Sequence, residues 1–150
     1  MSELDDFLTA MLDRQIAAET AIHNGEVEPR MALWSRSDPV TLLGAMGMSN
    51  VGWDTVSQTF RWVASRFSNC TAYSFELLAA GASGDLAYTV GFEHADLSVD
   101  GGPPQSTKVR VTHVYRREGG EWKIVHRHGD YVPVDDLPPE PGRGTATAGE

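Results

Sequence analysis

Apolar residues recur at three- and four-residue spacing in three segments of the N-terminal half, a pattern typical of helices with one buried face. The first predicted helix runs from Glu3 to Asn24, with Ser2 placed to cap its start and Gly25 placed to end it. A short second helix is predicted from Pro29 to Trp34, and a third from Gly52 to Phe67. These helices precede almost all of the predicted strands.

After residue 67 the pattern changes to alternation of apolar and polar residues, which is typical of half-buried strands. The predicted strands are "VTLLGA", before the third helix, and then "TAYSFELLAA", "LAYTVGFEHADL", "TKVRVTHVYRR" and "EWKIVHRHGDYV". This order predicts one α+β domain over residues 1–132: a cone-shaped, curved, antiparallel (mixed) sheet with three N-terminal helices on its concave face, enclosing a pocket. Residues 133–150 are rich in proline and glycine, and a disordered tail is predicted there.

A two-residue turn at Gly119–Gly120 predicts how the last two strands pair. It places Glu118 opposite Glu121, Tyr115 opposite Ile124, His113 opposite His126 and Val111 opposite His128. Directly opposed residues point to the same face. The predicted inner face consists of Val109, Val111, His113, Tyr115, Trp122, Ile124, His126, His128 and Asp130. The predicted outer face consists of Lys108, Arg110, Thr112, Val114, Arg116, Lys123, Val125, Arg127, Gly129 and Tyr131. The inner face is apolar near the turn and has histidines toward its other end, where a ligand pocket is expected.

The polar end of this inner face is the main candidate for chemistry. His126, His128 and Asp130 alternate along one strand, so their side chains are spaced about 6–7 Å apart. Three uses are open: a metal site completed by His113, general acid/base catalysis or ligand recognition, and plain hydrogen bonding at the end of a core strand. We predict His128, His126, Tyr88 and Asp130 as catalytic candidates, and no metal.

Other residues are candidates for contact with a ligand. Tyr88 is expected to point inward, where its hydroxyl could donate to a ligand oxygen, whereas Glu93 is expected to face solvent with Thr89. The predicted ligand contacts are Met31, Trp34, Trp53, Phe60, Val90, His113 and Tyr115. The alternative for each of them is ordinary core packing.

Charge and composition narrow the function classes. The formal net charge of -9 opposes binding to nucleic acid and to acidic membrane surfaces. No signal peptide and no segment long enough to span a bilayer are recognised, and the single cysteine, Cys70, cannot form an internal disulfide, so a cytoplasmic protein is expected. A catalytic Ser-His-Asp pattern, a phosphate loop and a dinucleotide fingerprint are all missing, and no cofactor is expected.

Three stretches carry a family resemblance: "LWSRSDPVTLLGAMG", "GDLAYTVGFEHA" and "VRVTHVYRREGGEWKIVHRHGD". Over about residues 3–132 the chain resembles the nuclear transport factor two-like superfamily, the cone-shaped fold of ketosteroid isomerase and SnoaL-like polyketide cyclases. The last stretch also looks like the association domain of calcium/calmodulin-dependent kinases. That similarity puts His113 where the kinase domain has a pocket arginine, and it also aligns Trp122, His126 and His128.

The chain departs from the isomerases at the positions that matter for their chemistry. The strand Val40–Leu43 lacks the family's catalytic aspartate, and the first helix contains no tyrosine, so steroid isomerisation is not carried over. Two functions are open. One is an isomerase-, cyclase- or dehydratase-like enzyme using histidine-mediated proton transfer on an apolar organic ligand. The other is a non-catalytic ligand-binding or association module with a vestigial pocket.

The outer face of the last hairpin is expected to be an interface. The resemblance implies that this sheet surface is used for dimerisation, as is common in the superfamily. Val114 and Val125 are predicted to sit opposite one another at its centre. A homodimer formed through this face is therefore predicted.

Overall fold

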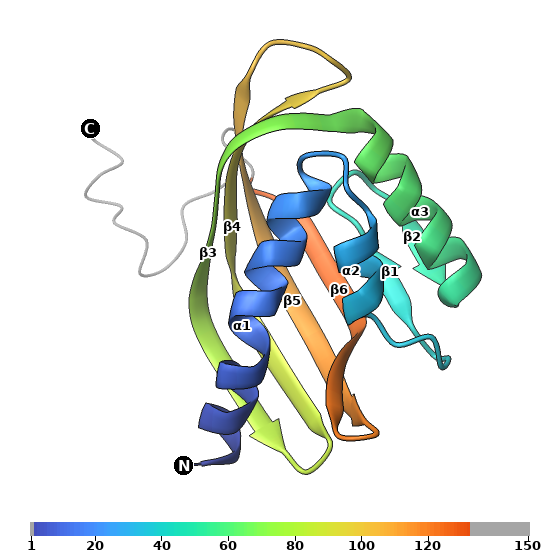
Figure 1. The fold of residues 1–150 in the computed structure, drawn as a ribbon, viewed down its shortest axis with the longest axis vertical. Helices are drawn as coiled ribbons and strands as arrows, with labels where there is room; N and C mark the ends of the chain where they lie inside the picture. The colour runs from blue at the N-terminus through green and yellow to red at the C-terminus, as the bar shows by residue number, and fades with distance from the viewer. Residues whose placement is uncertain (1, 133–150) are drawn as a thin grey trace, which may run out of the picture.

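A computed structural model of the chain describes residues 2–132, in which three helices lie on one side of a six-stranded sheet (Figure 1). The helices are α1 (Glu3–Ile22), α2 (Glu28–Leu33) and α3 (Trp53–Arg66). The strands are β1 (Thr41–Leu43), β2 (Ser49–Val51), β3 (Phe67–Ser83), β4 (Leu86–Val99), β5 (Gln105–Glu118) and β6 (Glu121–Tyr131). The three predicted helices are confirmed, whereas β2 was not predicted. The predicted tail, residues 133–150, lies outside the described residues.

The ends of α1 follow from local chemistry. Ser2 and Asp5 form a capping box, in which each side chain bonds the backbone N–H of the other and so satisfies donors that the helix leaves free. At the other end His23 is the C-cap, and Gly25 takes a φ of +87°, a left-handed conformation that glycine adopts at little cost. The first predicted helix is therefore confirmed, with its end two residues earlier than expected.

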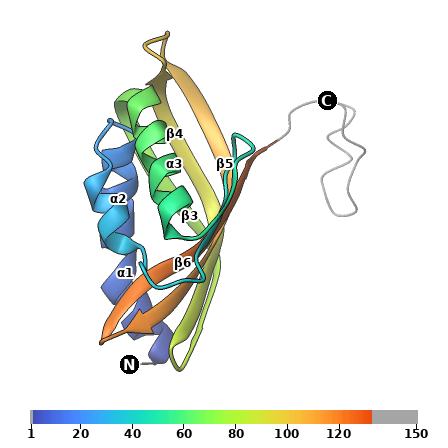
Figure 2. The same ribbon diagram turned by 90° about the vertical axis from the view of Figure 1, so that its right-hand side faces the viewer.

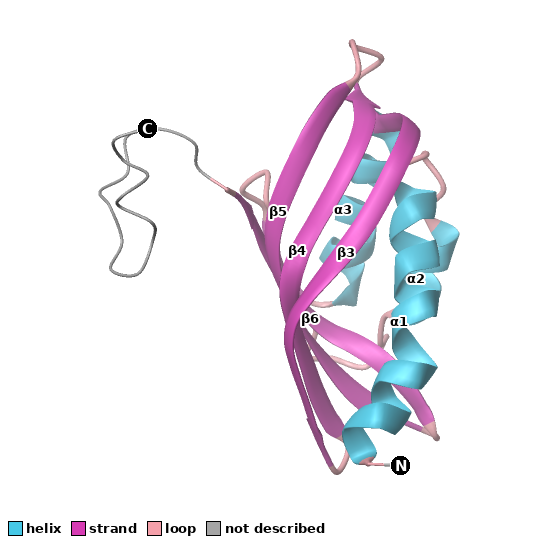
Figure 3. Ribbon diagram, turned by 90° about the vertical axis from the view of Figure 1, so that its left-hand side faces the viewer, coloured by secondary structure: helices cyan, strands magenta, loops and turns pink. Residues whose placement is uncertain are grey.

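The sheet is mixed and curved, as predicted. Its strand order is β2-β1-β6-β5-β4-β3, and the β1–β6 pair is parallel while the other pairs are antiparallel. Figures 2 and 3 show the sheet bending around the helices, which all lie on its concave side. The other side of the sheet is not covered by any described helix.

The core lies between α1 and the middle of the sheet. Phe7 of α1 makes edge-on contacts with the rings of Tyr115 and Trp122, with ring centres 4.8 and 5.0 Å apart. Trp34 and Phe60 form a second edge-on pair at 5.0 Å. These rings are all buried, and edge-on geometry is the arrangement that aromatic quadrupoles favour.

The pairing of β5 with β6 agrees with the prediction only near the turn. Glu118 pairs with Glu121 and Tyr115 with Ile124, as expected. Val114 then pairs with His126, so Val125 has no partner and forms a β-bulge. The predicted pairings of Val114 with Val125, of His113 with His126 and of Val111 with His128 are therefore wrong.

The bulge moves the rest of β6 by one residue and exchanges its faces, because side chains alternate along a strand. His126, His128 and Asp130 lie on the outer face, whereas Arg127 and Gly129 are buried on the inner face, the reverse of the prediction. The partners that favour this register come from other elements. Nδ1 of His126 lies 2.7 Å from the hydroxyl of Thr41 in β1, and Arg127 meets carboxylates from β4 and α1.

The predicted facing of β4 is also wrong. Thr89 and Glu93 are almost completely buried, whereas the Tyr88 side chain is 45% exposed on the outer face, which it shares with Val90. The inward facing of Thr89 and Glu93 is explained by hydrogen-bond partners on β5 and β6. Thr89 reaches the hydroxyl of Tyr115 at 3.0 Å, and Glu93 binds Arg127, so the polar residues of this strand turn inward.

Candidate functional site

A cavity of about 680 Å³ opens at the end of the sheet far from the Gly119–Gly120 turn. Its apolar lining comprises Leu42, Met46, Met48, Phe60, Val63, Phe67, Leu97, Val99 and Val109. Its charged or basic lining comprises His23, Arg30, Arg66, Glu93, Lys108 and Arg127. A mostly apolar cavity of this size, with a few grouped polar side chains, has the usual form of a small-molecule site.

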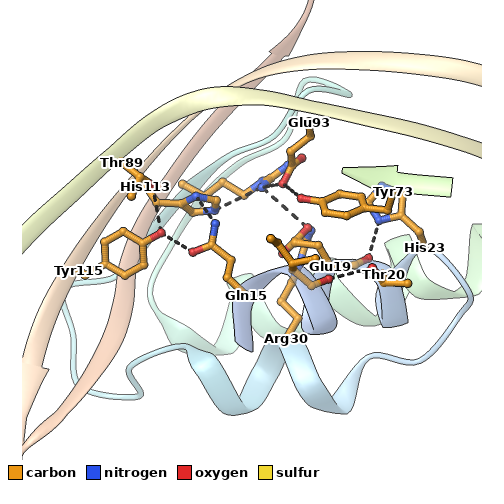
Figure 4. Close-up of polar contacts among 12 residues, drawn as sticks. Gln15, Glu19, Thr20, His23, Arg30, Tyr73, Thr89, Glu93, His113 and Tyr115 are labelled. Carbon is orange, nitrogen blue, oxygen red and sulfur yellow. Dashed lines mark hydrogen bonds and ion pairs between the residues drawn. The ribbon is translucent and has the colours of Figure 1, made fainter. Parts of the chain in front are cut away.

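Two buried ion pairs form the inner end of this cavity. Arg127 donates to both carboxylate oxygens of Glu93, at 2.9 and 2.6 Å. Arg30 makes a similar two-point contact with Glu19 of α1 (Figure 4). Arg127 also lies 3.9 Å from Glu19. All four side chains are at least nine-tenths buried, so each charge depends on its partner for stabilisation.

A chain of hydrogen bonds continues from this cluster into the core (Figure 4). Nη1 of Arg127 lies 3.2 Å from Nε2 of His113, and the side-chain amide of Gln15 lies 3.3 Å from Nδ1. Arginine can only donate, so Nε2 accepts and the proton of the neutral ring sits on Nδ1. A protonated Nδ1 donates, so it needs the amide oxygen of Gln15 as its partner. The oxygen and nitrogen of an amide are exchangeable in placement, and with the oxygen at Nδ1 the NH₂ group faces the Tyr115 hydroxyl.

Burial and neighbouring charges shift the pKa values of Glu93, His113 and Tyr73. Burial would raise the pKa of Glu93, but the charge and hydrogen bonds of Arg127 hold it well below its usual range, so the carboxylate stays ionised. Burial, with the repulsion of Arg127 next, lowers the pKa of His113 far below its ordinary value, so the ring is neutral. Burial and the charge of Glu93 raise the pKa of Tyr73, which donates to Glu93 at 2.9 Å.

His23 is the histidine that lines the cavity. Its ring lies 5.3 Å from the ring of Phe67, nearly parallel to it, and 5.3 Å from the ring of Tyr73. Nδ1 lies 2.6 Å from the backbone oxygen of Glu19, one turn earlier in α1. The C-terminal end of α1 therefore presents an imidazole to the same space as the buried ion pairs.

The four predicted catalytic residues do not line this cavity. His126, His128, Asp130 and Tyr88 lie on the outer face of the sheet, where Asp130 is bound by Arg110 at 2.7 and 2.9 Å. His128 and Asp130 instead border a shallower groove of about 250 Å³ on that face. The ring centres of His126 and His128 are 6.4 Å apart, which agrees with their spacing along the strand.

The predicted ligand contacts are divided between the cavity, the core and the outer face. Phe60 lines the cavity. Met31, Trp34, His113 and Tyr115 are buried in the core, Trp53 packs against its edge, and Val90 lies on the outer face.

Sequence reasoning missed the charged cluster, although one signal was present. Gln15 and Glu19 follow Met11 and precede Ile22 at helical spacing, so they occupy the buried stripe of α1. A glutamate on such a stripe requires a buried cation. The identity of that cation could not be read from the sequence, because Arg30 and Arg127 reach the site through tertiary packing.

Residues 2–132 contain neither a metal-binding cluster nor a membrane-spanning helix. Within residues 2–132, no group of three or more His, Cys, Asp or Glu side chains is arranged to hold a metal ion. Over the same range, none of the helices combines the length and the apolar character needed to cross a bilayer.

The family model for the SnoaL-like domain matches residues 10–135. The chain belongs to the SnoaL-like domain family. No curated protein matches the sequence. The family assignment and the fold confirm the resemblance that the sequence motifs indicated.

Solved structures with this fold share little sequence with the chain. A ketosteroid isomerase-like protein from Erwinia carotovora atroseptica superposes with a TM-score of 0.71 at 15% identity, covering 87% of this chain and 99% of that one. A candidate dehydratase of the NTF2-like family from Streptomyces avermitilis gives 0.68 at 21% identity, covering 87% and 99%. A candidate calcium/calmodulin-dependent protein kinase type II association domain from Thiobacillus denitrificans gives 0.64 at 20% identity, covering 80% and 93%. At these identities the similarity shows the fold alone.

Proposed function

We propose that this SnoaL-like chain binds a neutral small organic molecule with an apolar body in the 680 Å³ cavity. The cavity itself is the observation that carries the proposal, since it combines an apolar wall with a polar inner end. Two structural neighbours bear names of small-molecule enzymes, a dehydratase and a ketosteroid isomerase-like protein, which is in keeping with such a site.

The preference for a neutral ligand follows from the charges around the cavity. Arg127 is paired with Glu93 and Arg30 with Glu19, so the inner end carries two cations and two anions. Arg66, which also lines the cavity, is paired with Asp100 at 2.7 Å. Lys108, the remaining cation of the lining, has its ammonium group 4.2 Å from the centre of the Phe92 ring, which borders the groove on the outer face. A charged ligand at the inner end would have to displace a member of one of the two buried ion pairs, which leaves a buried charge uncompensated.

The test is to fill the cavity from α3. Val63 faces the cavity, and Val63→Trp should abolish binding of 2-methoxynaphthalene, a neutral apolar probe, measured by calorimetry. Arg61 lies on the exposed side of the same helix, and Arg61→Trp adds the same ring there and should leave binding unchanged. Val99→Trp, at the half-buried end of β4, is a second blocking variant if Val63→Trp does not fold. Binding that survives in a folded blocked variant would place the ligand elsewhere.

We also propose that the chain forms a homodimer through the outer face of the sheet. Leu78, Leu86 and Tyr88 are 56%, 56% and 45% exposed on that face, and apolar side chains gathered on an uncovered sheet are typical of an interface. Tyr88→Glu should convert the dimer to a monomer in size-exclusion chromatography with light scattering. Trp62→Glu, a similarly exposed ring on α3, is the matched control and should leave the dimer intact. A wild-type chain that is monomeric at micromolar concentration would refute the proposal.

A further inference from the structure

We propose that Nε2 of His23 accepts a hydrogen bond from a hydroxyl group of the ligand, so that the cavity selects phenols or enols over molecules without a donor. This inference rests on the proposed binding function and adds to it the chemical class of the ligand. His23 is not among the catalytic candidates predicted from the sequence, where it appears only as a residue near the end of a helix.

A neighbouring carbonyl oxygen decides which ring nitrogen of His23 carries the hydrogen when the ring holds one proton. Nδ1 lies 2.6 Å from the backbone oxygen of Glu19, and a carbonyl oxygen can only accept, so Nδ1 must carry the hydrogen. The same carbonyl also accepts from the backbone N–H of His23 at 3.1 Å, which fixes the ring relative to the helix end. A neutral imidazole protonated on Nδ1 has an unprotonated, accepting Nε2.

Nε2 is open to the cavity. Within residues 2–132, every fully buried side-chain nitrogen or oxygen has a hydrogen-bond partner. Nε2 of His23 makes no hydrogen bond to the protein in that range, so this atom is not fully buried. Nε2 is therefore in contact with accessible space, and the space that His23 lines is the cavity. An accepting nitrogen in this position calls for a donor from the ligand, because a donor gains a hydrogen bond there that an ether oxygen cannot make.

The polar groups around His23 are already engaged with one another. Glu93 and Arg127 bind each other, and the Tyr73 hydroxyl donates to Glu93. The ring of Phe67 lies nearly parallel to the imidazole and provides an apolar surface beside it. An aromatic alcohol would therefore place its ring among apolar side chains while its hydroxyl reaches Nε2.

The test compares two probes that differ by one donor, 2-naphthol and its methyl ether 2-methoxynaphthalene. We expect the wild-type chain to bind 2-naphthol about 3- to 10-fold more tightly, the ratio that one net hydrogen bond gives. His23→Asn keeps a donor close to the position of Nδ1 but removes Nε2, so the ratio should fall to about one. His128→Asn makes the same replacement on the outer face, where the side chain is exposed, and should keep the wild-type ratio.

Each outcome separates this inference from the proposed function. Equal affinities of the wild-type chain for both probes would overturn the role of His23 and leave the cavity as a binding site. A ratio that falls in His128→Asn and not in His23→Asn would place the acceptor on the outer face. Failure to bind either probe would overturn both proposals. Nitrogen NMR of the unliganded wild-type chain checks the tautomer independently of any variant, and a hydrogen found on Nε2 of His23 would also overturn the inference.

Discussion

Replacing Arg127 by methionine should lower the free energy of unfolding by about 3–5 kcal/mol, because Glu93 would remain buried without the cation that balances it. The two-point contact, at 2.9 and 2.6 Å, joins side chains that are only 9% and 3% exposed, so solvent hardly screens the loss. For a domain of this size, that loss corresponds to a fall in melting temperature of roughly 6–20 °C.

The same hairpin contains a matched control. Arg110 binds Asp130 with nearly the same geometry, 2.7 and 2.9 Å, but these side chains are 54% and 48% exposed. Arg110→Met should therefore cost less than about 1 kcal/mol, since exposed ion pairs contribute little. Urea denaturation followed by circular dichroism gives both free energies by linear extrapolation.

The double variant Arg127→Met with Glu93→Gln should recover part of the lost stability, because it removes the buried anion as well. If Arg127→Met and Arg110→Met instead cost the same small amount, Arg127 lies in solvent. The bulge at Val125 and the inward side of β6 would then be wrong, and the inner end of the cavity would lose its charged cluster.

Three other perturbations test the same architecture. His113 has a pKa in the native state well below that in the unfolded chain, so its contribution to stability is complete above about pH 6.5. That contribution is lost as the pH falls, by at most about 1.4 kcal/mol per pH unit. The difference in unfolding free energy between pH 7.5 and pH 5 should therefore shrink in His113→Gln, and an unchanged difference would contradict the buried neutral ring. Ser2→Ala removes the cap of α1 and should cost about 1 kcal/mol in urea denaturation, whereas no measurable change would show that the capping box adds nothing. Gly91→Ala would place a methyl group 2.3 Å from the backbone oxygen of Glu76, so its melting temperature should fall by several degrees, corresponding to about 1–3 kcal/mol, and a normal melting temperature would mean that β3 and β4 are not so close.

Local patterns in the sequence were enough to predict the helices, the long strands and the fold class. The three- and four-residue spacing around Phe7 and Met11 marks the buried side of α1, and Ser2 and Gly25 mark its ends. The turn at Gly119–Gly120 correctly set the pairing of Tyr115 with Ile124, because a two-residue turn determines the register of the residues next to it.

The site depended on partners that are distant in sequence. Alternation in β6 predicted His126 and His128 inside and Arg127 outside, but one bulged residue, Val125, exchanges the two sets. What favours that bulge is the burial of Arg127 against Glu93 of β4, near Glu19 of α1, and these contacts exist only once helix and sheet have packed. The sequence by itself determined which segments are helix and strand, since those depend on neighbouring residues. Only the tertiary structure decided which histidine reaches the cavity. The ion pairs of Arg127 with Glu93 and Glu19 turn Arg127 inward and so place His126 and His128 on the outer face, and these partners lie far apart in the sequence.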